Sequence, residues 1–545
     1  MTTETATAHQ TIARAGANTL GTLLARTASR NGKNTALRFE DREWTYAELE
    51  RAVHRVAHRL RDTDLPEGSR VAAYGLNSDA YAILFLACAT AGYVHVPVNF
   101  ALKGEELAYL LEDSGAALLV ADPALMPRIG EIRDQGRAAG VGQLWPFFPV
   151  EGRGGNDGGA DGAAVGAPDG VLLTTALLTT ALDESAPDTP LDLPIGDADL
   201  AQLLYTSGTT SAPKGAMMSH QALISEYVST IVALDLTEED RPLVCMPLYH
   251  SAAMHVFLMP YLALGATVRL LPKPDVPEVL RFVEAERIGS LFLAPTVWVP
   301  LSNHPDLDTR DLSSLTKAQY GASIMPVTVL QRLRERFPKL GFYNCFGQSE
   351  MAPLCTVLRP EEHHARPASC GRPVLFVEAR LITAEGALAQ PGEPGEVQYR
   401  SPQLMSGYWN KPEATAEAFD DGWFRSGDQA TQDEQGYLQI VDRIKDVINT
   451  GGVLVAPREV EDCIYELEQV AEVAVVGLPD ERWIEAVTAV VVLKEGAELT
   501  AETVRAHVKS KIADFKVPKR VDFVAELPRN QSGKLLKREL RAERS

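Results

Sequence analysis

The chain has 545 residues, of which 45% are hydrophobic, and a formal net charge of −21. Single hydrophobic cores stop growing at about 250–300 residues, so more than one domain is expected. The acidic balance disfavours a nucleic-acid partner, because phosphate backbones are bound by a surplus of lysine and arginine on one face. There is no uninterrupted run of about 18 apolar residues, and residues 1–10 lack the layout of a signal peptide, so a cytoplasmic protein without a transmembrane segment is expected.

Strands and helices alternate through the first part of the chain. Residues 1–16 are predicted to form a mobile tail. Thr45 and Glu48 have the spacing of a capping box, which predicts that a helix starts at Thr45. The alternation predicts a largely parallel sheet with helices on both faces. The predicted strands are 70–74, 93–98 and 118–121, and a further helix is predicted over 80–91.

A glycine-rich segment interrupts this alternation. Residues 151–170 have eight glycines in twenty residues and hardly any bulky apolar side chain. Such a composition cannot bury enough surface to become ordered, so the segment is predicted to be a surface excursion within the first domain. A second alternating block runs from 221 to about 340, with strands expected at 266–271 and 291–294. The short extended pieces of 376–442 predict a small β-rich subdomain.

Cysteine and histidine spacing gives no sign of a structural metal. The six cysteines are scattered and include no Cys-x-x-Cys pair, so they are expected to be free thiols packed as small hydrophobes. Neither His363–His364 nor the pair His250 and His255 has the spacing of a zinc site. Packed or solvated histidines are therefore expected at both places.

Residues 203–215 read Leu-Leu-Tyr-Thr-Ser-Gly-Thr-Thr-Ser-Ala-Pro-Lys-Gly. An apolar run gives way to hydroxyl side chains around one glycine, which offer hydroxyl and backbone N–H donors and one cation to a polyphosphate. On composition alone an ordinary Ser/Thr/Gly turn stays open. The phosphate loop of kinases and ATPases requires Gly-Lys followed by Ser or Thr. Because Gly215 follows Lys214 here, that alternative is excluded.

Further clusters of glycine and polar residues follow this loop. In the segment 344–350, Phe346 can stack on a purine, Asn344 can hydrogen-bond to its edge, and Glu350 supplies a hard oxygen ligand suited to Mg²⁺. Each cluster alone is more often a plain loop. The other clusters are 320–323, 423–428, 442–446, 450–459 and 528–534.

Taken in this order, the clusters resemble the motifs of the adenylate-forming superfamily, which includes acyl- and aryl-CoA synthetases, luciferases and peptide-synthetase adenylation domains. The resemblance covers about residues 20–541. It implies that ATP, Mg²⁺ and coenzyme A are used to convert a carboxylic acid into acyl-AMP and then into a thioester. The implied fold is α/β: a large N-terminal domain, 17–442, of two sheet-and-helix subdomains and a β-rich subdomain, followed by a small α+β domain, 443–545, that moves about a hinge near Lys445.

The resemblance also implies a role for individual residues. Lys534, Glu350, Thr206 and His250 form the implied catalytic set, and Thr206 and Glu350 the implied metal ligands. Asp428 would accept hydrogen bonds from the ribose hydroxyls, with Arg443 supporting the same sugar. The implied nucleotide- and CoA-binding residues are Thr206, Ser207, Gly208, Thr209, Thr210, Lys214, Gly321, Ala322, Ser323, Asn344, Phe346, Gly347, Gln348, Ser349, Asp428, Arg443, Lys445, Gly451, Gly452 and Lys534.

Four positions in three segments depart from the superfamily pattern in ways that bear on local conformation. Ser211 and Ile484 stand where glycine is common. Val453 and Leu454 stand where many acyl-CoA synthetases have Glu-Asn, in the loop that enters the active site for thioester formation. These departures are expected to affect the local backbone conformation of the three segments.

Residues 246–250, Met-Pro-Leu-Tyr-His, resemble the motif that begins the acyl pocket of fatty-acyl-CoA synthetases. The small and apolar side chains of 251–256 follow, so a fatty acid is expected first and an aryl acid second. An enzyme that loads a carrier-protein pantetheine would share every motif. A non-catalytic relative is opposed by the intact Lys534, Glu350, Asp428 and Arg443. A homodimer is left open.

Overall fold

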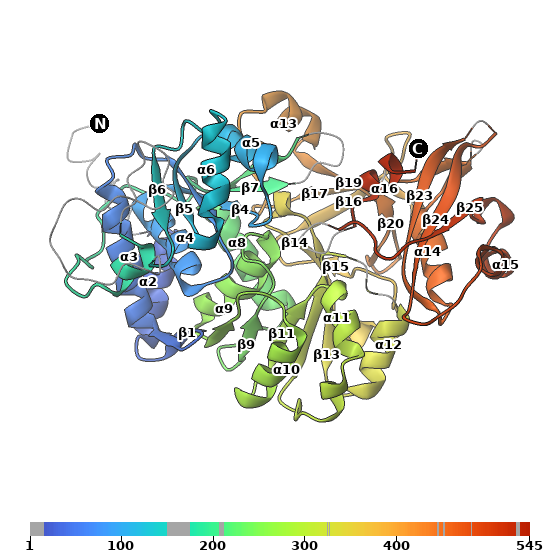
Figure 1. The fold of residues 1–545 in the computed structure, drawn as a ribbon, viewed down its shortest axis with the longest axis horizontal. Coiled ribbons are helices and arrows are strands. Elements are labelled where there is room, and N and C mark those ends of the chain that lie inside the picture. Colours follow the sequence, from blue (N-terminus) through green and yellow to red (C-terminus); the bar gives the residue numbers. More distant parts are fainter. Residues whose placement is uncertain are drawn as a thin grey trace.

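The computed structural model describes residues 16–149, 175–206, 212–323, 325, 327–443, 446–450, 453–480, 482–529 and 535–544. The predicted tail, apart from Gly16, and the predicted excursion at 151–170 lie outside these residues. Within them the strands form four sheets. Three sheets make a large body on the left of Figure 1, and the fourth belongs to a small body on its right.

The first sheet has six strands and is parallel except for its last pair, as the alternating pattern predicts. The helix expected at Thr45 is α3 (Tyr46–Arg61), and Thr45 is its N-cap, with its hydroxyl accepting from Glu48 N at 3.2 Å. The predicted strands at 70–74, 93–98 and 118–121 are confirmed within one or two residues. In spatial order the strands are β6 (Gln143–Pro146), β5 (Ala116–Ala121), β3 (Arg70–Tyr74), β4 (Val94–Val98), β7 (Leu200–Thr206) and β8 (Lys214–Ser219).

The second sheet has nine strands, with parallel pairs at its centre and antiparallel pairs at both edges. The strands predicted at 266–271 and 291–294 are β10 and β11. In spatial order the strands are β15 (Arg372–Pro373), β14 (Leu354–Leu358), β13 (Gly341–Gly347), β12 (Lys317–Gly321), β11 (Ser290–Leu293), β9 (Pro242–Val244), β10 (Val268–Leu270), β1 (Thr35–Phe39) and β2 (Arg42–Thr45).

The third sheet confirms the β-rich subdomain predicted for 376–442. It is antiparallel, and its strand β20 pairs with β19 outside the main path of the sheet. Its strands are β16 (Glu378–Ile382), β17 (Gly395–Arg400), β19 (Trp423–Gln432), β18 (Phe419–Asp420) and β20 (Leu438–Arg443).

One buried apolar cluster includes side chains from all three sheets, for example Leu118 of β5, Leu291 of β11 and Val397 of β17. Helix α4 (Asp79–Ala91), whose sequence is apolar on every face, lies inside this cluster. The shared core makes the three sheets a single body. The other helices of this body are α2 (Leu20–Asn31), α5 (Gly104–Ser114), α6 (Met126–Asp134), α7 (Leu177–Leu182), α8 (His220–Ala233), α9 (Met259–Leu264), α10 (Val276–Ala285), α11 (Pro295–Ser302), α12 (Val327–Arg336) and α13 (Pro412–Ala418).

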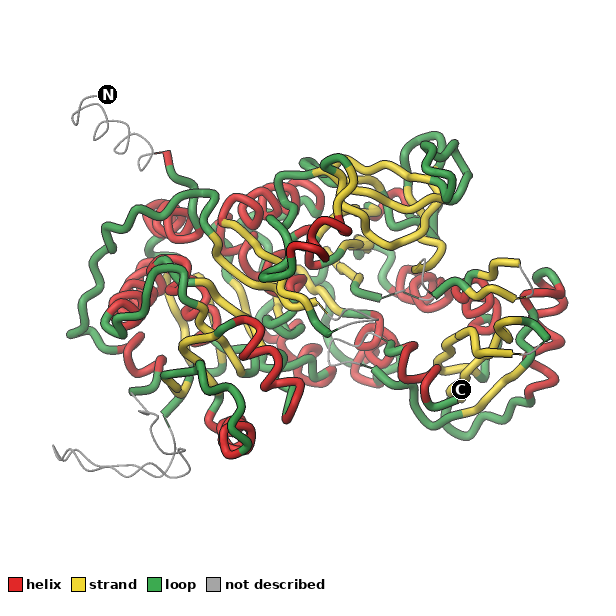
Figure 2. Tube along the Cα trace, turned by 90° about the horizontal axis from the view of Figure 1, so that it is seen from above, coloured by secondary structure: helices red, strands yellow, loops and turns green. Residues whose placement is uncertain are grey.

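The small body has its own sheet and its own buried clusters, which contain Ile448, Val475, Val487 and Leu540. Figure 2 shows it standing at one end of the molecule. A separate core is the mark of a separate domain. Its elements are β21 (Ile448–Thr450), β22 (Val453–Val455), α14 (Pro457–Tyr465), β23 (Val470–Asp480), β24 (Ile484–Leu493), α15 (Ala501–Lys511), β25 (Arg520–Phe523) and α16 (Lys537–Ala542).

All six cysteines are buried and outside any disulfide, as their spacing predicts. One histidine of each pair considered above is packed by a hydrogen bond: His363 contacts Tyr320 Oη at 2.9 Å, and His255 contacts Tyr227 Oη at 2.9 Å. No helix among the described residues is long and apolar enough to cross a membrane.

Candidate active site

The loop of 203–215 closes a β-hairpin. Strand β7 ends at Thr206, β8 begins at Lys214, and these two residues lie directly opposite each other. The base of the hairpin is fixed by Tyr205, whose hydroxyl donates to Asp113 Oδ2 at 2.8 Å. Ser207, Gly208, Thr209, Thr210 and Ser211 lie outside the described residues. Thr206 and Lys214 are therefore the described ends of the predicted phosphate loop.

Lys214 and Glu350 meet at the ring of Tyr408. The Lys214 ammonium lies 5.1 Å from the centroid of the Tyr408 ring, within the range of a cation–π contact. The Tyr408 hydroxyl donates to Glu350 Oε1 at 3.0 Å. Burial, and then the Glu350 carboxylate, raise the pKa of Tyr408, so its hydroxyl keeps the proton that it donates. Tyr408 was not among the residues predicted from the sequence; its signal there is the Gly-aromatic pair that it forms with Gly407.

The segment 344–350 runs from strand β13 into the short 3₁₀ turn Ser349–Met351. A Cβ at Gly347 would lie 1.8 Å from the Pro353 carbonyl oxygen, so only glycine fits at this position. Asn344 Nδ2 donates to Ser369 O at 3.0 Å, which orients its amide, and Phe346 packs partly buried against the core. Gln348 Nε2 is a buried donor that has no hydrogen-bond partner in the described part of the chain. Such an orphaned donor suits a site that receives a polar ligand.

The backbone that follows Glu350 is fixed by a buried polar cluster around Glu226 of α8. Glu226 accepts from Leu354 N at 3.1 Å and from Gln403 Nε2 at 2.5 Å. Gln403 Nε2 also donates to Met351 O at 3.2 Å. Burial raises the pKa of Glu226. These bonds fix the backbone on the C-terminal side of Glu350, and no local pattern in the sequence predicts them.

Strand β12 ends in the segment 321–323. A Cβ at Gly321 would approach the Cys345 carbonyl oxygen to 2.2 Å, and Ala322 has a left-handed φ of +64°. A non-glycine residue in that region stores strain, which is often found where a ligand is bound. Ala322 lines a narrow cavity together with Met246, Pro247, His250, Ala252, Ala253 and Phe292. The predicted acyl segment and the predicted nucleotide segment thus share a cavity.

The acyl segment continues as a π-helix over Ala252–Leu258, a rare form that is frequent at functional sites. His255 anchors the inner side of this helix through Tyr227 and through Gln202 Oε1 at 2.7 Å. Burial lowers the pKa of His255 to about 3, so this ring is neutral. At the start of the segment, Ser251 Oγ lies 2.9 Å from Ser349 Oγ. This contact ties the acyl segment to the loop of Glu350.

The predicted ribose pair lies on neighbouring strands of the third sheet. Asp428 of β19 stands directly opposite Arg443 of β20, and Asp428 Oδ1 lies 2.6 Å from Arg443 Nε. Asp428 is 3% exposed, whereas the Arg443 side chain is 33% exposed. The ion pair therefore presents a fixed carboxylate at the edge of the large body.

The remaining predicted residues lie outside the described residues: Lys445, Gly451, Gly452 and Lys534. The base of the Lys534 loop is described, because Arg529 and Leu535 form an antiparallel bridge. Ile484, at a position where glycine is common, has a left-handed φ of +66° and is 59% exposed. Ile484, a β-branched residue, therefore adopts the left-handed conformation that glycine would adopt at this turn.

The fold and the convergence of these segments define an adenylate-forming enzyme. A family model described as AMP-binding enzyme matches residues 24–409, and one described as AMP-binding enzyme C-terminal domain matches residues 459–534. The chain belongs to the AMP-binding enzyme family and is an acyl-CoA ligase.

Among relatives, a feruloyl-CoA synthase of an Amycolatopsis species is 38% identical over 96% of this chain and 98% of its own. A medium/long-chain-fatty-acid–CoA ligase of Mycobacterium tuberculosis is 42% identical over 66% of this chain and 62% of its own. Among solved structures, the ATP-bound MatB of Rhodopseudomonas palustris is 29% identical, with a TM-score of 0.83 over 96% of this chain and 98% of its own.

Proposed function

We propose that this acyl-CoA ligase acts on a flat aromatic carboxylic acid, with a fatty acid as the second candidate. The observation that carries the proposal is the cavity beside His250. This cavity is narrow, and small and apolar side chains line it beside His250. One wall is Phe292, whose ring stacks on Phe257 with centroids 4.0 Å apart and an angle of 12°. A narrow cavity with an aromatic side chain in its wall suits a planar ring.

From the motif of 246–250 alone, a fatty acid was the first expected substrate. The relatives include ligases named for both classes of acid. The 38% identity to a feruloyl-CoA synthase over nearly the whole chain supports the aromatic acid. The 42% identity to a fatty-acid ligase covers about two thirds of the chain and supports the second candidate. The substrate test below separates them.

The reaction needs no nucleophile from the protein. A carboxylate oxygen of the acid attacks the α-phosphorus of ATP, and pyrophosphate leaves with the electron pair of the broken P–O bond. The thiol of coenzyme A, after losing its proton, then attacks the acyl carbon, and AMP leaves. We assign Thr206, Lys214 and the loop between them to the phosphates, Asn344, Phe346 and Gln348 to the adenine, and Asp428 with Arg443 to the ribose.

Thr206 and Glu350 would hold Mg²⁺. One Glu350 oxygen is bound by Tyr408, which orients the carboxylate, and carboxylate and hydroxyl oxygens are the hard ligands that this ion prefers. Bound there, the ion would stabilise the charge that develops on the phosphate oxygens. We assign Lys534 to the same charge, delivered by the loop between Arg529 and Leu535, since preorganised electrostatic stabilisation is usually the largest catalytic contribution.

We also propose the domain limits 17–442 and 443–545, with rotation about a hinge near Lys445 between the two half-reactions. The ATP-bound relative is similar over 96% of the chain, with a TM-score of 0.83. We assign the described orientation of the two bodies to acyl-AMP formation. After rotation the loop with Gly451 and Gly452 would serve thioester formation.

The test is the rate of pyrophosphate release with benzoate, cinnamate, octanoate and palmitate, each with and without free coenzyme A. We expect kcat/KM to be at least tenfold higher for the better aromatic acid than for either fatty acid, with a CoA thioester as product. A preference for octanoate or palmitate would replace the first candidate by the second. Acyl-AMP formation without any thioester from free coenzyme A would favour a carrier-protein acceptor.

A further inference from the structure

One arginine of the small body bonds to the last strand of the large body. Arg458 lies in the first turn of α14, and its Nη1 donates to Ile440 O of β20 at 2.8 Å. Its backbone N–H donates to Asp442 Oδ2 at 3.3 Å. The side chain is only 18% exposed, so the guanidinium bond is partly shielded from water. Arg458 thus donates hydrogen bonds to two residues of strand β20.

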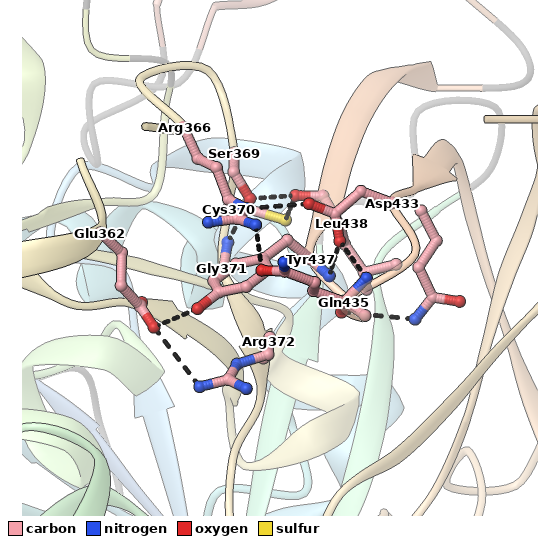
Figure 3. A network of polar contacts seen from close by, with 12 residues as sticks. Glu362, Arg366, Ser369, Cys370, Gly371, Arg372, Asp433, Gln435, Tyr437 and Leu438 are labelled. Atoms are coloured by element: carbon pink, nitrogen blue, oxygen red, sulfur yellow. Dashed lines mark hydrogen bonds and ion pairs between the residues drawn. The ribbon is translucent and has the colours of Figure 1, made fainter. Parts of the chain in front are cut away.

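Strand β20 is a fixed support on the side of the large body. Figure 3 shows its first residue, Leu438, bonded to the loop 366–372: Cys370 N donates to Leu438 O at 2.9 Å, and Leu438 N donates to Gly371 O at 2.8 Å. The neighbouring Tyr437 ring lies under two guanidinium groups, those of Arg366 at 3.8 Å and Arg372 at 4.7 Å. At its other end β20 carries Arg443, which is paired with Asp428. The acceptors of Arg458 therefore lie between two anchored points.

Helix α14 also connects to the segment that follows Lys534. Glu461, one turn after Arg458, pairs with Lys537 Nζ of α16 at 2.9 Å and accepts from Val475 N at 2.8 Å. Arg541 of the same helix α16 lies 2.8 Å from Asp446, next to the hinge. Lys537 follows Lys534 by three residues. Helix α14 is therefore a rigid connection between the ribose strand β20 and the Lys534 loop.

We propose that Arg458 is a positioning residue for acyl-AMP formation, which it serves by fixing the small domain on β20. This inference rests on the proposed function and adds to it. Ile440 and Asp442 belong to the large body, whereas Glu461 and Lys537 belong to the small one. Rotation about the hinge breaks the bonds of Arg458 and leaves the Glu461–Lys537 pair intact. Arg458 consequently acts on one half-reaction, because it makes these bonds in one orientation.

The alternative hypothesis is that Arg458 only stabilises helix α14, where it also lies 3.7 Å from Asp462. That hypothesis predicts that substitution of Arg458 slows both half-reactions equally. The variants are Arg458→Ala, Arg458→Lys as the conservative change, and Arg520→Ala as the control. Arg520 is an arginine of the small body whose Nε lies 2.8 Å from Asp522 on its own strand, away from β20.

The assay measures each half-reaction separately, by rapid quench, as acyl-AMP formation from acid and ATP and as thioester formation from supplied acyl-AMP and coenzyme A. We expect Arg458→Ala to slow acyl-AMP formation about tenfold or more, the usual effect of losing a charged hydrogen bond. Thioester formation should change less than about twofold, in keeping with surface changes. Arg458→Lys should restore most of the lost rate, because an ammonium can still donate to Ile440 O.

A second readout needs no turnover. Tryptic cleavage of the hinge at 443–446 should be faster in Arg458→Ala than in the wild type or in Arg520→Ala, with unchanged melting temperatures. Equal losses in both half-reactions, an unchanged rate of acyl-AMP formation, or equal cleavage rates would overturn the proposal. A wild-type protein that forms no acyl-AMP from any acid, yet shows the difference in cleavage, would instead overturn the proposed function and leave Arg458 as the contact that orients the domain.

Discussion

The contact between Tyr408 and Glu350 allows a quantitative prediction about the metal. Tyr408→Phe removes the hydroxyl that donates to Glu350 Oε1 at 3.0 Å and keeps the ring on which Lys214 lies. A hydrogen bond to an ionised group contributes about 1.5–3 kcal/mol, which corresponds to about 10- to 150-fold in an equilibrium constant. Loss of a group that orients a metal ligand typically costs about 10–100-fold in affinity. We therefore expect the Mg²⁺ concentration for half-maximal activity to rise by about 10–100-fold.

The assay is pyrophosphate release at saturating acid and ATP over a range of Mg²⁺ concentrations, with the maximal rate and the midpoint reported separately. Tyr437→Phe is the matched control, because Tyr437 also donates to a carboxylate, Glu362 at 2.5 Å, to which no metal role is assigned. The control should lose some stability but keep the Mg²⁺ midpoint. An unchanged midpoint in Tyr408→Phe, or equal shifts in both variants, would refute the assignment of Glu350 as an oriented metal ligand.

Four further changes test other parts of the site. Lys534→Ala should cost at least about 2.7–4 kcal/mol in the barrier to acyl-AMP formation, by analogy with a single oxyanion donor, which single-turnover rates measure. Gly452→Leu should spare acyl-AMP formation and block thioester formation from supplied acyl-AMP, and parallel losses in these two variants would contradict domain alternation. Ala252→Trp should narrow the acyl cavity and shift kcat/KM toward smaller acids; an unchanged profile would remove this segment from the pocket. Ile484→Gly should raise the free energy of unfolding by about 0.5–1 kcal/mol, because it relieves about 1–2 kcal/mol of left-handed strain at φ +66° and adds the chain entropy of glycine. Val453→Gly, at an ordinary strand position, should lower the free energy of unfolding.

Local patterns predicted the elements whose signal is local. The capping box of Thr45 and Glu48 marked the start of α3 to within one residue, because both side chains bond to the first turn itself. The short apolar runs at 70–74 and 118–121 are buried strands, as their composition indicates. The π-helix at Ala252–Leu258 has no such signal, since its form depends on His255 being held by Tyr227 and Gln202 from distant elements.

The order of motifs predicted which segments would form the site, but it did not predict the contacts between them. Ser251 and Ser349, 98 residues apart, meet at 2.9 Å, and Tyr408 reaches Glu350 across 58 residues. These contacts depend on the packing of whole sheets, which cannot be inferred from residue spacing. Glycine at 347 was visible in the sequence, but its reason, the approach of the Pro353 carbonyl to the position of a Cβ, is tertiary.

The division of the core explains how one chain can carry out two half-reactions. Apart from Lys534, the groups assigned to ATP and acid belong to the three sheets that share one buried apolar cluster, so they move together. The buried clusters of the small body contain no described residue before Ile448. Separating a shared core would cost about 1.5–3 kcal/mol for each large side chain exposed, whereas a hydrogen bond such as that from Arg458 to Ile440 contributes about 1–3 kcal/mol. A domain held by polar contacts of this size can leave its orientation and return within a catalytic cycle, and each such contact can be tuned by a single substitution without disturbing either core.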